Sequence, residues 1–297
     1  MNDFNGVIIL NKPVGGSSHR CVSIARRALN MKKIGHTGTL DPLASGVLPL
    51  LIGTATRAAD FLSSEDKRYR ATILLGTKTD TLDITGNVIS TSPVSLTEEK
   101  IKETIYSFIG EIAQIPPMYS AIQVNGQRLY NLARSGIEVE RQARCVTIFS
   151  IDIVEISLPR IIIDVHCSKG TYIRTLASDI GDALQTGGCI EALERTSCGI
   201  FNIKDSITPD QLMELSLNGN VESAIIPLDK LFLNHREIKL DKKRADRVKN
   251  GVPIYYKTNS LNEIFRIYDE EGVFIALSKS DMEDNRQCLR LIKGFYK

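Results

Sequence analysis

The sequence predicts an α+β protein in which a sheet domain of residues 1–233 is followed by a small β-barrel domain of residues 234–297. Up to residue 233, segments typical of strands are interspersed with segments of helical periodicity, which is the pattern of an α+β sheet domain. After that point, short strand-like segments are separated by turn signals such as Glu271-Gly272. A chain of 297 residues is long enough to bury a core in each domain.

The first domain begins with a buried strand and a helix. The apolar run from Gly6 to Asn11 predicts the strand, and Ser17 or Ser18 is placed to cap the helix that follows. The glycine-rich loop between them lacks the Gly-Lys-Ser/Thr ending of a phosphate-binding loop, which argues against nucleotide binding. Residues 33–60 are punctuated by glycine and proline and have little periodicity in their first half, so they predict a fixed, irregular loop.

Periodicity predicts the later strands. Alternation indicates a strand at 69–75, and the segments 146–156 and 160–167 indicate a strand pair. In the small domain, strands are predicted at 264–268, 273–277 and 287–292.

Capping residues predict two further helices. Ser95 and Glu98 fit a capping box for a helix that Gly110 stops. Thr171 fits the N-cap of a second helix, which ends at Gly187-Gly188.

Charge is segregated along the chain, although the net charge is only +2. No Asp or Glu occurs between Phe4 and Leu40, a stretch that holds six lysines and arginines, and a second basic run occupies 236–249. This asymmetry indicates a basic face that meets a polyanion, although a solvated helix face produces the same pattern.

Composition excludes several classes of protein. A hydrophobic content of 42% with 24% charged residues is typical of a soluble globular protein. No apolar segment approaches the roughly 20 residues needed to cross a bilayer, and the run at 7–10 is too short for a signal peptide. We therefore expect a cytoplasmic protein that does not contact membranes. The six scattered cysteines and four histidines show no metal-ligand spacing, so we expect neither a metal nor another cofactor.

The most informative segment is residues 35–49, Gly-His-Thr-Gly-Thr-Leu-Asp-Pro-Leu-Ala-Ser-Gly-Val-Leu-Pro. Asp41 precedes a proline, which biases it toward an extended conformation on a stiff loop. A carboxylate on such a loop can be presented to a ligand without an ordering cost. An Asp-Pro pair is also common in turns that have no function.

Residues 35–42 resemble the Gly-His-Thr-Gly-x-Leu-Asp-Pro signature of the TruB family of bacterial tRNA pseudouridine synthases. The similarity continues in the same order at 66–70, Asp-Lys-Arg-Tyr-Arg, at 114–121, and at 167–174, Cys-Ser-Lys-Gly-Thr-Tyr-Ile-Arg. The resemblance implies a pseudouridine-synthase-like, mixed and largely antiparallel sheet with flanking helices, a thumb insertion at about 114–144 and a PUA-like RNA-binding barrel. It also implies an isomerase that converts uridine 55 in the TΨC loop of tRNA to pseudouridine, with the tRNA T-arm as partner and no obligate protein partner.

The resemblance implies that Asp41 is the catalytic carboxylate. Making pseudouridine breaks the N1–C1′ bond of uridine and rejoins uracil through C5, so a carboxylate can stabilise or capture positive charge at C1′. Attack of Asp41 on C1′, attack on C6 and removal of a sugar proton all remain open. Burial alone would raise the pKa of Asp41, so a nearby cation is expected, and the pocket arginine of the family matches Arg174. Because Arg174 falls in the first turn of a helix, a compensating carboxylate is also expected.

Four further residues match family positions in the pocket. Tyr69 offers a stacking face for uracil and a hydroxyl that could assist removal of the C5 proton. Tyr172 and Leu193 match the walls of the base pocket. His36 matches the place where the flipped base leaves the RNA stack, so it is assigned to substrate binding.

The insertion interleaves aromatic and basic residues, a composition that suits contact with an RNA loop. These polar and aromatic residues are Tyr119, Gln123, Asn125, Gln127, Arg128, Tyr130, Arg134, Arg141 and Arg144. One departure from the family is Glu194 before Arg195, where relatives often carry consecutive arginines, and it puts one contact to the RNA backbone in doubt.

Two other functions are compatible with the basic segments. A non-catalytic RNA-binding protein that helps tRNA to fold would use the same basic face, although the complete set of Asp41, Tyr69 and Arg174 argues against a purely non-catalytic role. A relative that works in a guide-RNA complex is disfavoured by the thumb and the short barrel.

Overall fold

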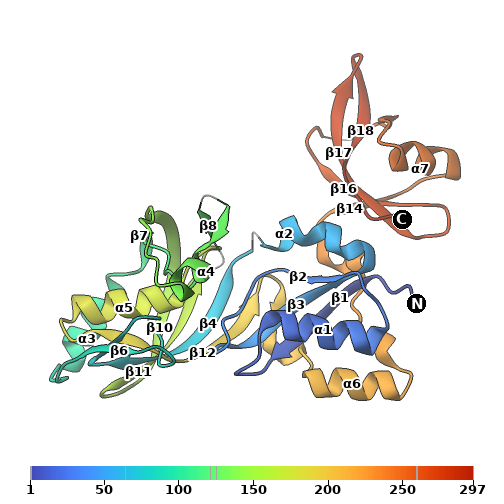
Figure 1. The fold of residues 1–297 in the computed structure, drawn as a ribbon. Coiled ribbons are helices and arrows are strands. Elements are labelled where there is room, and N and C mark those ends of the chain that lie inside the picture. The colour runs from blue at the N-terminus through green and yellow to red at the C-terminus, as the bar shows by residue number, and fades with distance from the viewer. Residues whose placement is uncertain (1, 64, 121, 125, 259, 297) are drawn as a thin grey trace.

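The computed structural model describes residues 2–63, 65–120, 122–124, 126–258 and 260–296. Within these residues, nine strands form one sheet in the order β1-β3-β12-β4-β11-β10-β7, with β2 on β3 and β13 on β12 (Figure 1). The strands are β1 Gly6–Lys12, β2 Ile34–His36, β3 Ser45–Ile52, β4 Lys67–Leu75, β7 Gly110–Gln114, β10 Arg144–Ser157, β11 Arg160–Cys167, β12 Gly188–Cys198 and β13 Phe201–Asn202. Neighbours pair antiparallel except β3 and β12, which confirms the mixed, largely antiparallel sheet.

Helices flank this sheet. They are α1 Ser18–Leu29, α2 Ala59–Ser63, α3 Glu98–Tyr106, α5 Ile173–Ala183 and α6 Pro209–Leu217, with the 3-10 turns η1 Gly53–Ala58, η2 Ile203–Asp205, η3 Val221–Ala224 and η4 Leu228–Phe232. A hairpin of β5 Thr77–Thr79 and β6 Val88–Thr91 lies beside them. Helices α1 and α6 lie side by side, and α5 packs against β12 (Figure 1). Across the described residues no helix combines the length and hydrophobicity needed to span a membrane.

The helix caps agree with the sequence in one case of three. Ser17 caps α1, accepting from the amide of Arg20 at 3.1 Å. The predicted capping box at Ser95 is wrong, because the Thr97 side chain accepts from the amide of Lys100 at 3.3 Å and α3 ends well before Gly110. The predicted N-cap at Thr171 is also wrong. Its hydroxyl donates backward to the Ser168 carbonyl at 2.9 Å, and the next residue takes the cap position.

Two central strands are not apparent from the sequence pattern. Strand β3 lies within the segment predicted as an irregular loop, and it has almost no alternation because seven of its eight residues are buried. Strand β12 follows α5, which ends at Ala183 and not at Gly187-Gly188. Two irregularities in its pairing with β4 interrupt the period of two.

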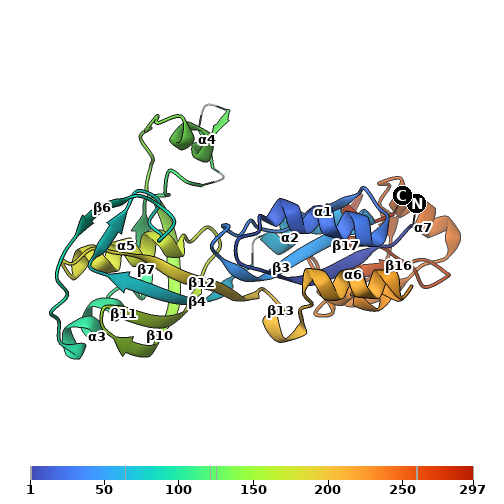
Figure 2. The ribbon, with the colours of Figure 1, turned by 60° about the horizontal axis from the view of Figure 1, so that its bottom comes forward.

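The predicted thumb leaves the sheet between β7 and β10 and projects as a separate lobe (Figure 2). It contains β8 Gln123–Val124, β9 Gln127–Arg128 and α4 Leu129–Arg134. Asn125, one of the residues predicted to meet RNA, lies outside the described part of the chain.

The C-terminal domain is a curled five-stranded sheet, which agrees with the PUA-like fold predicted for it. Its elements are β14 Arg236–Lys239, α7 Lys242–Lys249, β15 Ile254–Tyr255, β16 Ile264–Tyr268, β17 Phe274–Glu283 and β18 Arg286–Gly294. An apolar cluster joins it to the first domain, with Leu277 and Phe295 packed in the same cluster as Val7, Val47 and Phe232. The domain boundary at 233/234 remains a prediction.

Candidate active site

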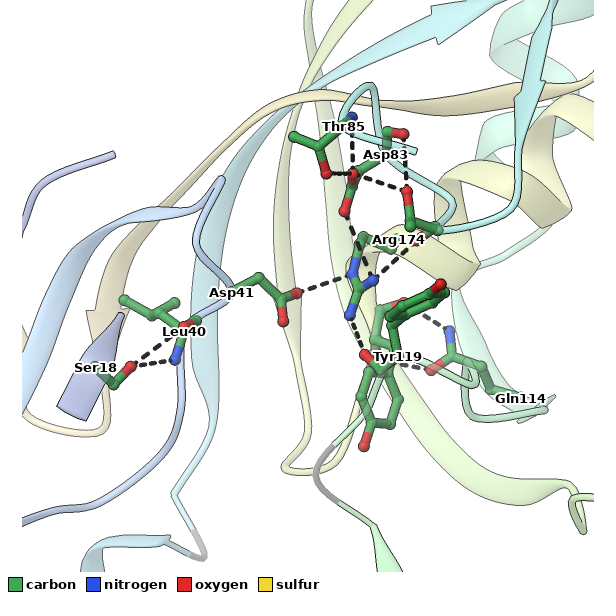
Figure 3. Close-up of polar contacts among 10 residues, drawn as sticks. Ser18, Leu40, Asp41, Asp83, Thr85, Gln114, Tyr119 and Arg174 are labelled. Carbon is green, nitrogen blue, oxygen red and sulfur yellow. Dashed lines mark hydrogen bonds and ion pairs between the residues drawn. The ribbon is translucent and has the colours of Figure 1, made fainter. Parts of the chain in front are cut away.

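The loop that carries Asp41 is held by buried side chains from three directions. The Lys12 ammonium donates to the carbonyls of Pro42 at 3.4 Å and Ala44 at 2.6 Å. Figure 3 shows the Ser18 hydroxyl, which accepts from the amide of Leu40 at 2.9 Å. From β12, Arg195 donates to the carbonyls of Gly38 at 3.2 Å and Val47 at 2.7 Å. The predicted stiffness of the loop therefore comes from these anchors as well as from the Asp-Pro bond.

Asp41 and Arg174 form an ion pair, as Figure 3 shows. Arg174 Nε lies 2.8 Å from Asp41 Oδ2, and the Arg174 side chain is 5% exposed, whereas that of Asp41 is 36% exposed. The same guanidinium donates to the carbonyls of Thr81 at 2.9 Å and Tyr119 at 2.7 Å. Its fork is thus fixed on the side away from Asp41, while the carboxylate keeps one face toward the pocket.

The carboxylate expected to compensate Arg174 is Asp83. Its Oδ2 lies 3.6 Å from Arg174 Nη1, and its Oδ1 accepts from the hydroxyl of Thr81 at 2.9 Å and the amide of Thr85 at 3.0 Å (Figure 3). The sequence predicted that a carboxylate would compensate Arg174 but did not identify the residue. The nearby Asp80 instead accepts hydrogen bonds from the backbone and side-chain amides of Asn87.

The surroundings of Asp41 favour the protonated form of its carboxyl group more than water does. Burial raises the pKa of Asp41, the guanidinium of Arg174 opposes that shift, and the carboxylate of Asp83 adds to it, leaving the pKa above its usual value of 3.8. Arg174 thus reduces the cost of burying the charge without removing it.

If the ionised form of Asp41 is the active one, single-turnover activity should fall as pH drops through this raised pKa. Neutralising Asp83 removes a charge that raises that pKa, so Asp83→Asn should move the acid limb of the pH profile to lower pH. Rate constants measured with excess enzyme across the acid range would check this. An acid limb that stays in place or moves upward in Asp83→Asn would contradict the assignment of the limb to Asp41.

Tyr69 lies on β4 with 8% of its surface exposed. Burial raises the pKa of Tyr69 to about 12. The phenol is therefore protonated at neutral pH, so its hydroxyl can donate or relay a proton but is a poor base on its own. The residue opposite Tyr69 in register on β12 is Arg195.

The site opens into a pocket of about 310 Å³. Its walls include Asp41, Tyr69, Tyr172, Arg174 and Leu193, so five of the six predicted site residues line one cavity. The exception is His36, which does not line the pocket. It lies on β2, its Nδ1 accepts from the amide of Gly38 at 3.3 Å, and burial lowers the pKa of its imidazole.

Tyr172 is fixed by a reciprocal pair of hydrogen bonds. The Gln114 side chain donates to the Tyr172 carbonyl at 3.0 Å and accepts from its amide at 2.7 Å (Figure 3). This clamp joins the start of the thumb to the start of α5, which carries Arg174. The pocket walls that sequence reasoning missed include Lys67, Ser120 and Arg195.

No group of three metal-ligating side chains occurs in the ranges that the structure describes. The site presents a carboxylate paired with a guanidinium beside an aromatic ring, in a pocket of nucleoside size.

Comparison with known proteins identifies the family. Residues 26–173 match the model of the TruB family pseudouridylate synthase N-terminal domain, and residues 174–233 match that of the tRNA pseudouridylate synthase B C-terminal domain. The fold and the site thus define a pseudouridine synthase, which is an isomerase.

Close relatives cover nearly the whole chain. Proteins called tRNA pseudouridine synthase B are 45% identical in Clostridium kluyveri, over 92% of this chain and 94% of that protein, and 46% identical in Alkaliphilus oremlandii, over 87% and 86%. A solved Cbf5-Nop10-Gar1 complex contains a chain that is 27% identical with a TM-score of 0.72, covering 98% of this chain and 85% of that chain. The chain belongs to the TruB family of pseudouridylate synthases.

Proposed function

We propose that this pseudouridine synthase isomerises uridine 55 in the TΨC loop of tRNA, with Asp41 as its catalytic carboxylate. The relatives called tRNA pseudouridine synthase B support a tRNA substrate. The observation that carries the assignment of Asp41 is its ion pair with Arg174 at the wall of a pocket that has room for one nucleoside.

The pocket suggests a role for each wall. The flipped uracil stacks on Tyr69 between Tyr172 and Leu193, which brings C1′ of its ribose toward the open face of Asp41. The ionised carboxylate then stabilises or captures the positive charge at C1′ while the N1–C1′ bond breaks. His36, outside the pocket, contacts the nucleotides that flank the flipped base.

The thumb and the basic residues of α1 suit the shape of a folded RNA arm. We propose that the protein acts without a protein partner, in the cytoplasm where tRNA is modified, because this chain supplies the predicted pocket residues Asp41, Tyr69, Tyr172, Arg174 and Leu193 itself. The alternative, a tRNA-folding protein without catalysis, is not favoured, because the family is a family of synthases.

Tritium release tests the proposal. A tRNA transcript labelled at C5 of its uridines should lose one equivalent of tritium to water, because forming the C5 glycosidic bond expels the C5 proton. Replacing uridine 55 by cytidine should abolish release. Equal release from this variant tRNA, or from an unstructured oligomer, would overturn the T-arm assignment, and no release from any tRNA would overturn the function.

A further inference from the structure

Two buried cations, Lys67 and Arg195, lie in the pocket wall and have no part in the mechanism above. Lys67 is 8% exposed, Arg195 is 1% exposed, and both line the same cavity as Tyr69. Among the described residues, neither has a carboxylate within 4.0 Å, in contrast to Arg174, which has two. A buried cation without a counter-ion is costly, so an arrangement of two of them favours an anionic ligand.

The fold directs both side chains toward the same wall. Lys67 and Tyr69 are two residues apart on β4 and therefore point to one face of the sheet, and Arg195 is opposite Tyr69 on β12. Backbone carbonyls hold both cations: Lys67 donates to those of Ser63 and Glu65, and Arg195 donates to those of Gly38 and Val47. Carbonyl dipoles orient a cation without neutralising it.

The proposed reaction generates an anion at this place. When the C1′–N1 bond of uridine breaks, its electron pair stays on N1, so uracil becomes an anion while C1′ becomes electron-deficient. The anion must turn in the pocket until C5 supplies the electron pair for the new C5–C1′ bond. The C5 proton then leaves, and N1 receives a proton. Asp41 can stabilise the positive sugar, but it repels the uracil anion.

We propose that Lys67 and Arg195 form an anion subsite that stabilises the detached uracil while it turns. This inference rests on the proposed function. In this arrangement the carboxylate of Asp41 faces the electron-deficient sugar, and the two cations face the negatively charged base.

An RNA phosphate is the other anion that the subsite could take, and the burial of the cations disfavours it. Phosphates stay at the surface of a bound RNA, where exposed residues such as Lys169, next in the chain to the pocket residue Gly170, can meet them. Lys67 and Arg195 lie beside the ring on which the base stacks. Loss of a phosphate contact would weaken RNA binding, whereas loss of anion stabilisation would slow bond cleavage.

The leaving ability of the base separates these roles. Fluorine at C5 withdraws electrons, so 5-fluorouracil is a more stable anion than uracil and needs less help from the protein. Single-turnover rates would be measured on a T-arm stem-loop that carries either uridine or 5-fluorouridine at the target position. Loss of the original N-glycoside would be followed by nuclease digestion and mass spectrometry, because the fluorinated base has no C5 proton to release.

Lys67→Met should slow the reaction of uridine by about a hundredfold and that of 5-fluorouridine by at most about tenfold. Lys67→Arg keeps the charge and should retain the ratio of the two rates found in the parent protein. Arg195→Gln should show the same selective loss as Lys67→Met, and it replaces that variant as the test if Lys67→Met does not fold.

Three results would overturn the subsite. Equal slowing of both substrates would mean that the cations only support the structure. Weaker RNA binding with unchanged single-turnover rates would assign them to phosphate contact. Unchanged rates and affinity in both variants would leave them without a role in the reaction. If the parent protein transforms neither substrate, the proposed function itself is overturned, and this outcome is distinct from the three above.

Discussion

Asp41→Asn should lower the single-turnover rate of pseudouridine formation by at least about a thousandfold while RNA affinity changes little. The amide keeps the size of the side chain but removes the charge that the chemistry at C1′ or C6 needs. It also replaces the ion pair with Arg174 Nε, 2.8 Å long in the parent protein, by a contact between the guanidinium and a neutral amide. Tritium release and filter binding on the same tRNA would measure both quantities.

Asp164→Asn is the matched control for that variant. Asp164 also pairs with an arginine, Arg70, through two hydrogen bonds of 2.8 and 2.7 Å, but that pair is exposed on the face of the sheet opposite to Tyr69. Its loss should leave the rate unchanged, because exposed ion pairs contribute little. If Asp41→Asn retains a tenth or more of the parent rate, Asp41 is not the catalytic carboxylate.

The fold was predictable where strands or helices have one face in the core. Strand β4 alternates buried and exposed residues, and the alternation is plain in the sequence. Strand β3 lies between β1 and β12 and is covered on both faces, so its sequence shows an apolar run that contains Pro49 and no period. Such strands are identified by their partners, which lie far away in the chain.

Site residues that lie in a family motif were predictable from the sequence. Residues whose place in the site depends on how the chain folds around them were less predictable. Asp41 and Arg174 belong to the long matching segments, and the structure brings them together. The position of Asp83 depends on how the segment after β5 turns back toward α5, and no local pattern reports that turn. Lys67 and Arg195 lie in or beside sequence segments that match the family. Their burial without a carboxylate partner is visible only in the structure.

Arg174 combines two requirements that the sequence alone sets in conflict. It is the second residue of α5, where the helix dipole disfavours a cation. Asp41 and Asp83 lie on either side of it, so the three charges alternate in sign and the guanidinium is held although the helix opposes it. A guanidinium with several N–H donors is needed, because Arg174 contacts two carboxylates and donates to two backbone carbonyls at the same time.

Arg174→Lys should therefore lower the single-turnover rate by about a hundredfold or more, although the charge is kept. A lysine ammonium cannot reach Asp41, Asp83 and the carbonyls of Thr81 and Tyr119 together, so at least one buried acceptor loses its donor. We also expect the free energy of unfolding to fall by about 1–3 kcal/mol, as for other unsatisfied buried groups. Tritium release and urea unfolding would give the two values.

Arg160→Lys provides the comparison, since Arg160 makes an equally short bidentate pair with Glu191 at 2.7 and 2.9 Å on the exposed side of the sheet. There a lysine can satisfy the carboxylate with help from water, so both the rate and the stability should stay near those of the parent. Equal behaviour of the two variants would show that the fork of Arg174 is dispensable and that charge alone orients Asp41. A large loss confined to Arg174→Lys would show that the geometry of the guanidinium, fixed by the carbonyls of Thr81 and Tyr119, orients the carboxylate of Asp41.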